Sequence, residues 1–295
     1  MFTLAHLSDP HLGPIPTPRL RELINKRGLG IINWYRKRHR HHRADVLAAI
    51  VADMKAQSPD HVAVTGDLVN VSLDIEFANA AHWLDTVGTP NDVTLVPGNH
   101  DAYIRRASGW AARHWGEFMR GDDGAAFPFV RRRGPVALIG LTTSLPTGPF
   151  MATGRLGGEQ LARLAEILIA LAREPLFRVV LIHHPPIPNR RHYMKRLIDG
   201  AMFRALLAEH GAELVLHGHN HDQQLMWLDG PKGRRIPAVG VPSASAIVST
   251  HDDPAAYNLY RVGGEPGAWQ CEMTVRGFTF GREGITELKR ETLIG

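Results

Sequence analysis

Aspartate, asparagine and histidine side chains recur in short groups along this sequence of 295 residues, which contains 17 histidines. These residue types bind divalent metals and transfer protons, and histidine is the commonest protein metal ligand. The candidate positions are Asp9, His11, Asp67, Asn99, His100, His183, His219 and His221. The single cysteine, Cys271, excludes an internal disulfide and an all-cysteine zinc site.

The elements that position these residues can be predicted from the apolar pattern. Strands are expected over 2–8, 61–64, 93–96, 136–141, 178–182, 213–217, 223–228, 235–241, 257–262 and 269–277. Helices are expected from apolar residues at helical spacing over 44–57, 74–86, 159–172 and 201–210. Strands that alternate with helices predict an α/β sheet protein, and the later strands predict a β-rich C-terminal part.

Each candidate residue follows the end of a predicted strand. Ligands of open α/β sheets bind beyond the carboxyl ends of the strands, so we expect these side chains to converge. Two carboxylates, an amide and several imidazoles would be costly to bury together without partners, and divalent metals would supply those partners. The neighbouring glycines Gly66, Gly98 and Gly218 permit tight turns and close backbone approach.

Five short motifs stand in a fixed order along the chain. They are Asp9-Pro10-His11, Gly66-Asp67, Gly98-Asn99-His100-Asp101, His183-His184-Pro185 and Gly218-His219-Asn220-His221. This order resembles the calcineurin-like metallophosphoesterase superfamily, and the resemblance spans residues 3–241. It implies an α/β fold, a four-layer αββα sandwich of two mixed β-sheets flanked by helices. The sequence His-His-Pro-Pro at 183–186 is similar to that of class III cyclic-nucleotide and small-molecule phosphodiesterases.

The resemblance also implies roles for the motif residues. Asp9, His11 and His221 would bind one divalent metal, Asn99, His183 and His219 a second, and Asp67 would bridge the two. Such a pair of metals clamps the attacking and leaving oxygens of a phosphodiester, which a metal-bridging hydroxide attacks. His100 would contact the phosphate or protonate the leaving group. Mixed nitrogen and oxygen ligands without thiolate suit Mn, Fe or Zn.

One position departs from the phosphatase branch of the superfamily. That branch carries an aspartate three residues after the bridging aspartate, followed by an arginine, whereas this chain has Asn70 and Val71. An amide orients an imidazole less strongly than a carboxylate does, so we expect a weaker hold on His100. The departure also argues against a protein phosphatase.

A basic segment follows the first motif. Residues 19–43 hold nine Lys/Arg against one acid, Glu22, which gives +8, so the other residues carry −3 of the net charge of +5. A charge run is usually a solvated face, but Trp34, Tyr35 and aliphatic residues are interleaved with these charges. The alternative interpretation is an electropositive cap that binds anionic substrate or an anionic membrane surface. Its candidate substrate contacts, with His100, are Arg36, Arg38, Arg190 and Arg191.

These observations leave three functions open. The first is hydrolysis of an anionic, nucleotide-like phosphodiester, and the second is hydrolysis of a lipid pyrophosphate of the UDP-2,3-diacylglucosamine type at a membrane. The third, a nuclease or nucleic-acid-binding protein, is disfavoured because no extended basic stripe appears. We expect one catalytic domain over 1–277 with the insertion 13–43, and a C-terminal tail over 278–295. Without an apolar span or a secretory signal, the protein is expected in the cytoplasm, with peripheral membrane contact through 19–43.

Overall fold

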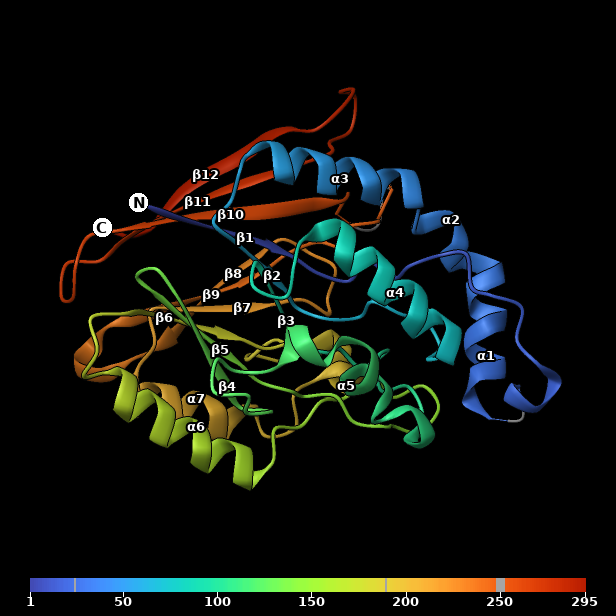
Figure 1. Cartoon of the computed structure of the whole chain (residues 1–295), viewed down its shortest axis with the longest axis horizontal. Helices are drawn as coiled ribbons and strands as arrows, with labels where there is room; N and C mark the ends of the chain where they lie inside the picture. Colours follow the sequence, from blue (N-terminus) through green and yellow to red (C-terminus); the bar gives the residue numbers. More distant parts are fainter. Residues whose placement is uncertain (24, 189, 248–252) are drawn as a thin grey trace.

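Two six-stranded β-sheets pack face to face in the computed structural model, which describes residues 1–23, 25–188, 190–247 and 253–295 (Figure 1). The first sheet has the order β12 (Thr286–Ile294), β11 (Gln270–Gly277), β10 (Ala256–Gly263), β1 (Phe2–Leu7), β2 (His61–Val64) and β3 (Val93–Leu95). The second has the order β4 (Phe129–Arg133), β5 (Val136–Gly140), β6 (Phe177–Leu181), β7 (Leu214–His217), β9 (Arg235–Gly240) and β8 (Gln224–Asp229). Both sheets are mixed: β1, β2 and β3 are parallel at one side of the first sheet and its other strands pair antiparallel, whereas in the second sheet the parallel strands β5, β6, β7 and β9 lie between the antiparallel edge strands β4 and β8.

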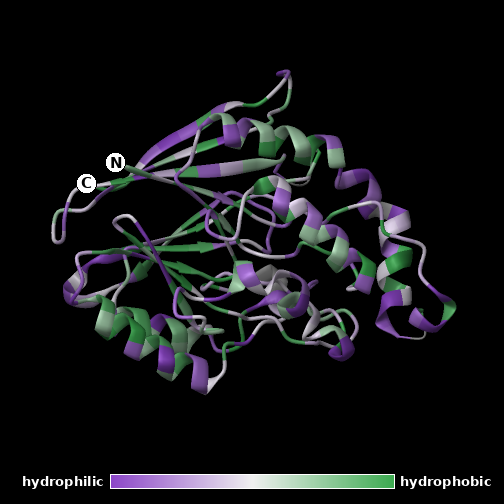
Figure 2. Ribbon diagram, in the orientation of Figure 1, coloured by the Kyte–Doolittle hydropathy of each residue, from purple (hydrophilic) through white to green (hydrophobic). Residues whose placement is uncertain are grey.

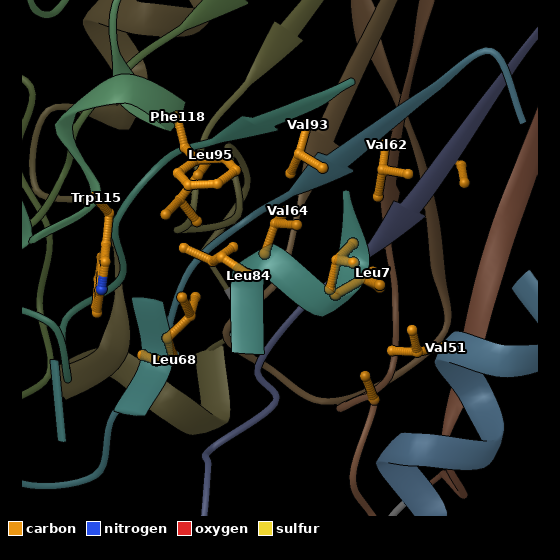
Figure 3. Packing of buried hydrophobic residues seen from close by; sticks show 14 of the residues in the cluster. Leu7, Val51, Val62, Val64, Leu68, Leu84, Val93, Leu95, Trp115 and Phe118 are labelled. Carbon is orange, nitrogen blue, oxygen red and sulfur yellow. The ribbon is translucent and has the colours of Figure 1, made fainter. Parts of the chain in front are cut away.

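Helices cover the outer face of each sheet. The first sheet carries α3 (Ala44–Ala56) and α4 (Asp74–Val87), and the second carries α6 (Gly158–Leu171) and α7 (Gly200–His210) (Figure 1). In α3 the buried residues Leu47, Ile50, Val51 and Met54 recur every three or four positions, so one face of the helix packs on the sheet. Figure 3 shows this layer, where strand residues such as Val64 and Leu95 gather with Leu84 and Trp115. The four-layer αββα prediction is confirmed.

A third apolar layer lies between the two sheets. Leu4 and Tyr260 from the first sheet pack with Leu138, Phe177 and Leu216 from the second, and all five are fully buried. Figure 2 shows the same division, with hydrophobic residues along the central strands and hydrophilic residues on the outward sides of the helices. This apolar layer holds the two sheets face to face.

The insertion after the first motif contains several short helices in the residues that the structure describes. It contains α1 (Lys26–Asn33), a π-helical turn over Trp34–Arg38 and α2 (His39–His41), and it lies at one end of the molecule (Figure 1). Ile15, Ile31 and Trp34 pack with Val71 and Leu73 in a small core of their own. Other short helices are α5 (Trp110–Trp115) and the 3₁₀ turns Leu20–Glu22, Arg105–Ala107, Gly116–Met119, Arg190–Lys195 and Pro231–Gly233.

The C-terminal segment is part of the first sheet. Its strand β12 pairs antiparallel with β11 and forms the edge of the sheet, with mostly exposed side chains. Residues 278–295, expected as a tail, therefore contribute a strand to the sandwich. None of the helices in the described residues is long and apolar enough to cross a membrane.

Candidate active site

The candidate metal ligands lie together beyond the ends of β1, β2, β3, β6 and β7, as the strand-end pattern predicted. Six of them are buried, while His221 is partly exposed: Asp9, His11, Asp67, Asn99, His183 and His219. Because the parallel strands of both sheets end at one edge, residues from opposite halves of the sequence meet there. This convergence is the structural basis of the site.

Five of these residues have a left-handed backbone. The φ angles are 52° at Asp9, 40° at His11, 56° at Asp67, 72° at His219 and 62° at His221. Residues other than glycine rarely adopt positive φ, and such residues cluster at functional sites. The turn after each strand bends the chain so that side chains two residues apart enter the same space. These bends bring Asp9 and His11, and likewise His219 and His221, to the site together.

One group of side chains surrounds His183. Its Nε2 lies 3.2 Å from Oδ1 of Asn99, 3.2 Å from Nδ1 of His219 and 3.4 Å from Oδ2 of Asp67. The other nitrogen of each ring donates to a backbone carbonyl, His183 Nδ1 to Thr65 at 2.6 Å and His219 Nε2 to Lys195 at 3.0 Å. In the neutral form of each ring, the nitrogens that face each other therefore carry lone pairs. A cation between them would satisfy those lone pairs and the carboxylate.

A second group surrounds His11. Its Nε2 lies 3.3 Å from Nε2 of His221, 3.9 Å from Oδ1 of Asp9 and 3.8 Å from Oδ2 of Asp67. Nδ1 of His11 faces the carbonyl of Val69 at 3.3 Å, which leaves the Nε2 lone pair for the site. Asp67 thus lies between the two groups, with the same carboxylate oxygen close to a histidine of each.

Divalent cations fit this arrangement on two grounds. Oδ1 of Asp9 is buried and has no hydrogen-bond partner among the described residues, although Nε2 of His221 lies 3.2 Å away. Burial alone would lower the pKa of His183, but the carboxylates of Asp67 and Asp9 raise that pKa to about 9. The site thus attracts positive charge.

Two glycines of the motifs permit the close approach of these loops. A Cβ atom at Gly98 would collide with the carboxylate of Asp67, and one at Gly218 would collide with the side chains of Ser8 and Asp9. These two glycines therefore permit the close backbone approach that the sequence predicted.

Asp101, the last residue of the third motif, holds two of the loops together. Its carboxylate accepts backbone N–H groups from Gly98 and Asp67 at 2.8 Å, from Leu68 at 2.9 Å and from Val69 at 3.2 Å. Asp101 therefore positions the loop of Asp67 against the loop of Asn99. Sequence reasoning included this residue in the motif but assigned it no role.

His100 is oriented by backbone rather than by a side chain. Its Nδ1 donates to the carbonyl of Asn70 at 2.5 Å, while the Asn70 amide donates to the carbonyl of Leu12 at 2.8 Å. The expectation that the side-chain amide of Asn70 would orient this imidazole is wrong. The backbone carbonyl of residue 70 orients the ring, and a residue of any type at this position would supply that carbonyl. Burial, reinforced by Arg38 and opposed by Asp67, lowers the pKa of His100 to about 4. The free ring is therefore neutral, with the Nε2 lone pair toward the site.

Of the candidate substrate contacts, Arg38 reaches the centre of the site. Nη2 of Arg38 donates to Nε2 of His11 at 2.8 Å, and Nη1 donates to Nε2 of His100 at 3.3 Å. Arg36 is exposed and lines the cleft above. The side chains of Arg190 and Arg191 lie outside the described part of the structure.

His42 is a residue of the site that sequence reasoning missed. It is buried at the end of the insertion, and one ring nitrogen each of His42, His11 and His221 lie within 4.8 Å of one another. In the sequence, nothing distinguishes it from His39 and His41 in the same run. Only the tertiary structure of the insertion brings His42 to the site.

A cleft of about 840 Å³ opens above the two groups. The insertion and residues 148–152 line it, together with candidate ligands from both sheets. Nζ of Lys26 donates to the carbonyl of Thr147 at 2.9 Å, so it links α1 to the loop that forms the other wall. The described lining carries no acidic side chain except Asp67, whereas its cations are Lys26, Arg36, Arg38 and Lys195. The cleft is therefore suited to an anionic ligand.

The sequence is similar to those of known proteins. The family model of calcineurin-like phosphoesterases matches residues 2–223. A probable cyclic nucleotide phosphodiesterase of a Synechococcus species is 25% identical over 231 residues, which are 77% of this chain and 80% of that relative.

Solved structures share the fold. A dimetal phosphatase from Danio rerio superposes with a TM-score of 0.62 at 13% identity, over 99% of this chain and 98% of that one. A purple acid phosphatase from yellow lupin, Lupinus luteus, superposes with a TM-score of 0.60 at 10% identity, over 97% of this chain and 53% of that one. The match of the family model covers every motif of the site, and the chain belongs to the calcineurin-like phosphoesterase family.

Proposed function

We propose that this protein is a dinuclear metal-dependent phosphodiesterase that hydrolyses an anionic, nucleotide-like phosphodiester. The observation that carries the proposal is the pair of side-chain groups around His11 and His183, which share Asp67 and lie at the floor of a cationic cleft. A paired donor set of this kind suits two-metal phosphoryl chemistry, and a cationic cleft attracts an anionic substrate.

The donor set divides between two divalent metals. Asp9, His11 and His221 would hold one, Asn99, His183 and His219 the other, and Asp67 both. When bound, two such cations lower the pKa of water between them and neutralise charge on the phosphoryl oxygens. Imidazole, amide and carboxylate ligands without thiolate favour Mn, Fe or Zn.

Arg38 is placed to bind the phosphoryl group. Its guanidinium donates to the same lone pair of His11 that a metal would take, so metal binding there frees Nη2 for another acceptor. A phosphoryl oxygen is the acceptor that the forked donors of arginine match best. The insertion would thus supply a phosphate-binding cation to a site whose other parts come from the two sheets.

His100 is placed to deliver a proton to the leaving oxygen. With Nδ1 held by the carbonyl of Asn70, only Nε2 can exchange a proton with a ligand in the cleft. The low pKa of the free ring means that a nearby phosphoryl anion must raise it before His100 can act as an acid. Substrate binding would therefore supply the charge that makes this group a proton donor.

A diester rather than a monoester is supported by the Synechococcus relative, whose name gives a cyclic nucleotide as its substrate class. The cleft volume is also within the range of about 300–1,000 Å³ that small-molecule sites show. A nucleic acid is not favoured, because the residues outside 19–43 carry net negative charge.

A second candidate is an amphiphilic phosphoester, such as a lipid pyrophosphate of the UDP-2,3-diacylglucosamine type. The observation that favours it is apolar: Leu29, Ile32, Phe150 and Met151 line the cleft and have exposed side chains. Acyl chains could cover these residues while the phosphate binds below. In that case α1 would contact an anionic membrane surface through residues 19–43.

Phosphorus NMR separates these candidates. Manganese-loaded protein is given cyclic AMP, UDP-2,3-diacylglucosamine and a simple phosphomonoester. Conversion of cyclic AMP to AMP, lost in Asp67→Ala and Asn99→Ala, is the expected result. Release of UMP would favour the lipid pyrophosphate instead, and exclusive hydrolysis of the monoester would refute a phosphodiesterase.

Sedimentation with anionic vesicles tests the membrane contact. The double variant Leu29→Ser/Ile32→Ser should bind fewer vesicles than the wild type if α1 makes the contact. Wild-type protein that stays in the supernatant would count against any role of the insertion at a membrane.

A further inference from the structure

The insertion places one more histidine against the metal-binding residues. We infer that His42 is a protein ligand of the metal held by Asp9, His11 and His221, which makes the insertion part of the metal centre rather than only a wall of the cleft. This inference rests on the two-metal site proposed above. It adds an imidazole that none of the five motifs contains.

The first support is that the backbone around His42 is held from both sides. The N–H of His42 donates to the carbonyl of Arg38 at 2.9 Å, and the N–H of Arg43 donates to the carbonyl of Ser245 at 2.9 Å. His42 also forms a bridge with Ala246 in an antiparallel arrangement. The residue therefore belongs to the sandwich and to the insertion at once, so its position does not depend on the insertion alone.

The second support is the orientation of the ring. Its plane is within 7° of the plane of Trp34, with ring centroids 6.5 Å apart, and its Nδ1 lies 2.8 Å from Oγ of Ser245. Oγ of Ser243 lies 3.3 Å from Oγ of Ser245 and donates at 2.6 Å to the carbonyl of Asp9. The carbonyl of Asp9 can only accept, so Ser243 gives its one proton to it. For all three hydrogen bonds to form, Ser245 must donate to Ser243, and Nδ1 of His42 must donate to Ser245.

The third support follows from that direction. With Nδ1 as the donor, Nε2 carries the lone pair, and within the described residues no hydrogen bond to Nε2 is present. The ring meets His11 edge-on at a centroid distance of 4.7 Å and His221 at 5.7 Å. A third imidazole with a free lone pair therefore joins two others whose Nε2 atoms lie 3.3 Å apart. Ligand histidines characteristically donate their second ring nitrogen to such a partner.

The consequence is an asymmetric centre. The metal near His11 would have three imidazoles from His11, His42 and His221, together with oxygens of Asp9 and Asp67. The metal near His183 would have two imidazoles, one amide and Asp67. The first position would therefore bind the divalent ion that favours nitrogen more strongly, such as Zn²⁺ over Mn²⁺.

Calorimetric titration of metal-free protein with Mn²⁺ and with Zn²⁺ tests the assignment. Loss of a ligand should weaken one of the two binding events at least tenfold in His42→Ala and in His42→Gln, and leave the other within about twofold. The glutamine variant keeps a polar side chain of similar reach for Ser245. The control is His82→Ala, which removes an exposed histidine from α4.

Chemical rescue distinguishes a ligand from a packing residue. In His42→Gly, added imidazole should restore the weakened event, and it should also restore the visible absorption of the Co²⁺-loaded protein to that of the wild type. Two unchanged affinities in both His42 variants would overturn the inference, and so would weak binding without rescue. Wild-type protein that binds fewer than two metals would instead refute the proposed dinuclear centre.

Discussion

Replacement of Trp34 by alanine should release the insertion while the sandwich stays folded. Trp34 is 3% exposed and is the largest member of the small core that holds the insertion, where it packs with Ile15, Ile31, Val71 and Leu73. Truncation of a buried tryptophan costs about 3–5 kcal/mol. This small core is separate from the three apolar clusters of the sandwich, so the loss of stability should fall on the insertion.

The magnitude can be read as a cleavage rate. At about 1.4 kcal/mol per factor of ten, a loss of 3 kcal/mol raises the open population of the insertion more than a hundredfold. Trypsin is a suitable probe, because residues 19–43 contain nine Lys/Arg. When opening is fast relative to cleavage, the cleavage rate follows that population. Trp34→Ala should therefore be cut within 19–43 at least a hundred times faster than the wild type.

The matched control is Tyr35→Ala, because Tyr35 is 59% exposed and adjacent in sequence. Its cleavage rate should stay within about threefold of the wild type. The main thermal transition should stay near that of the wild type in both variants. Equal cleavage of Trp34→Ala and wild type would refute the reasoning, and so would a main transition that falls in step with cleavage, since the insertion and the sandwich would then unfold together.

Three further predictions concern the site and the core. Gly218→Ala should leave about one metal per chain by elemental analysis of folded protein, because the new methyl group displaces Asp9; two tightly bound metals would contradict this. Arg38→Lys should lower kcat/KM about tenfold to a hundredfold with metal content unchanged, because one ammonium replaces a forked donor; wild-type kinetics would remove Arg38 from substrate binding. Burial lowers the pKa of His61 to about 3, so the unfolded chain takes up a proton below about pH 6.5 that the folded chain excludes, and stability falls as pH falls. In urea denaturation, the decline between pH 7 and pH 5 should be about 2 kcal/mol smaller in His61→Gln than in the wild type, and equal declines would refute the assignment.

The sandwich and its strand-end residues could be predicted because each depends on local patterns. The helix over 44–57 follows from Leu47, Ile50 and Met54 at helical spacing, and the structure has it at Ala44–Ala56. Asp9 and Asp67 could be placed at one edge because parallel strands end together. What could not be predicted there was the positive φ of these residues, which arises from the packing of loops far apart in sequence.

The insertion could not be predicted because its structure depends on tertiary contacts. Helix α1 contains Gly28 and Gly30, which lower helix propensity. It is stabilised from outside, since the buried guanidinium of Arg27 donates to the carbonyls of Val71 and Ser72. Its charge was visible in the sequence, but which arginine reaches the site was not.

Two edge strands of the sheets were not predicted from the sequence, for a similar reason. Strand β4 contains three arginines in a row, and it is stable because the buried Arg131 donates to four backbone carbonyls. Strand β12 has mostly exposed side chains, as an edge strand does, so it lacks the apolar alternation that identifies a strand. Their pairing partners, rather than their own composition, determine both.

The left-handed backbone at Asp9, His11, Asp67, His219 and His221 sets catalysis against thermostability in this chain. Each such conformation costs a residue other than glycine about 1–2 kcal/mol, and glycine avoids that cost. Selection for heat resistance alone would therefore favour glycine at the positions of the candidate metal ligands. A search for stabilised variants of this protein should hold these five residues constant, because glycine there would raise stability only by removing the candidate metal ligands.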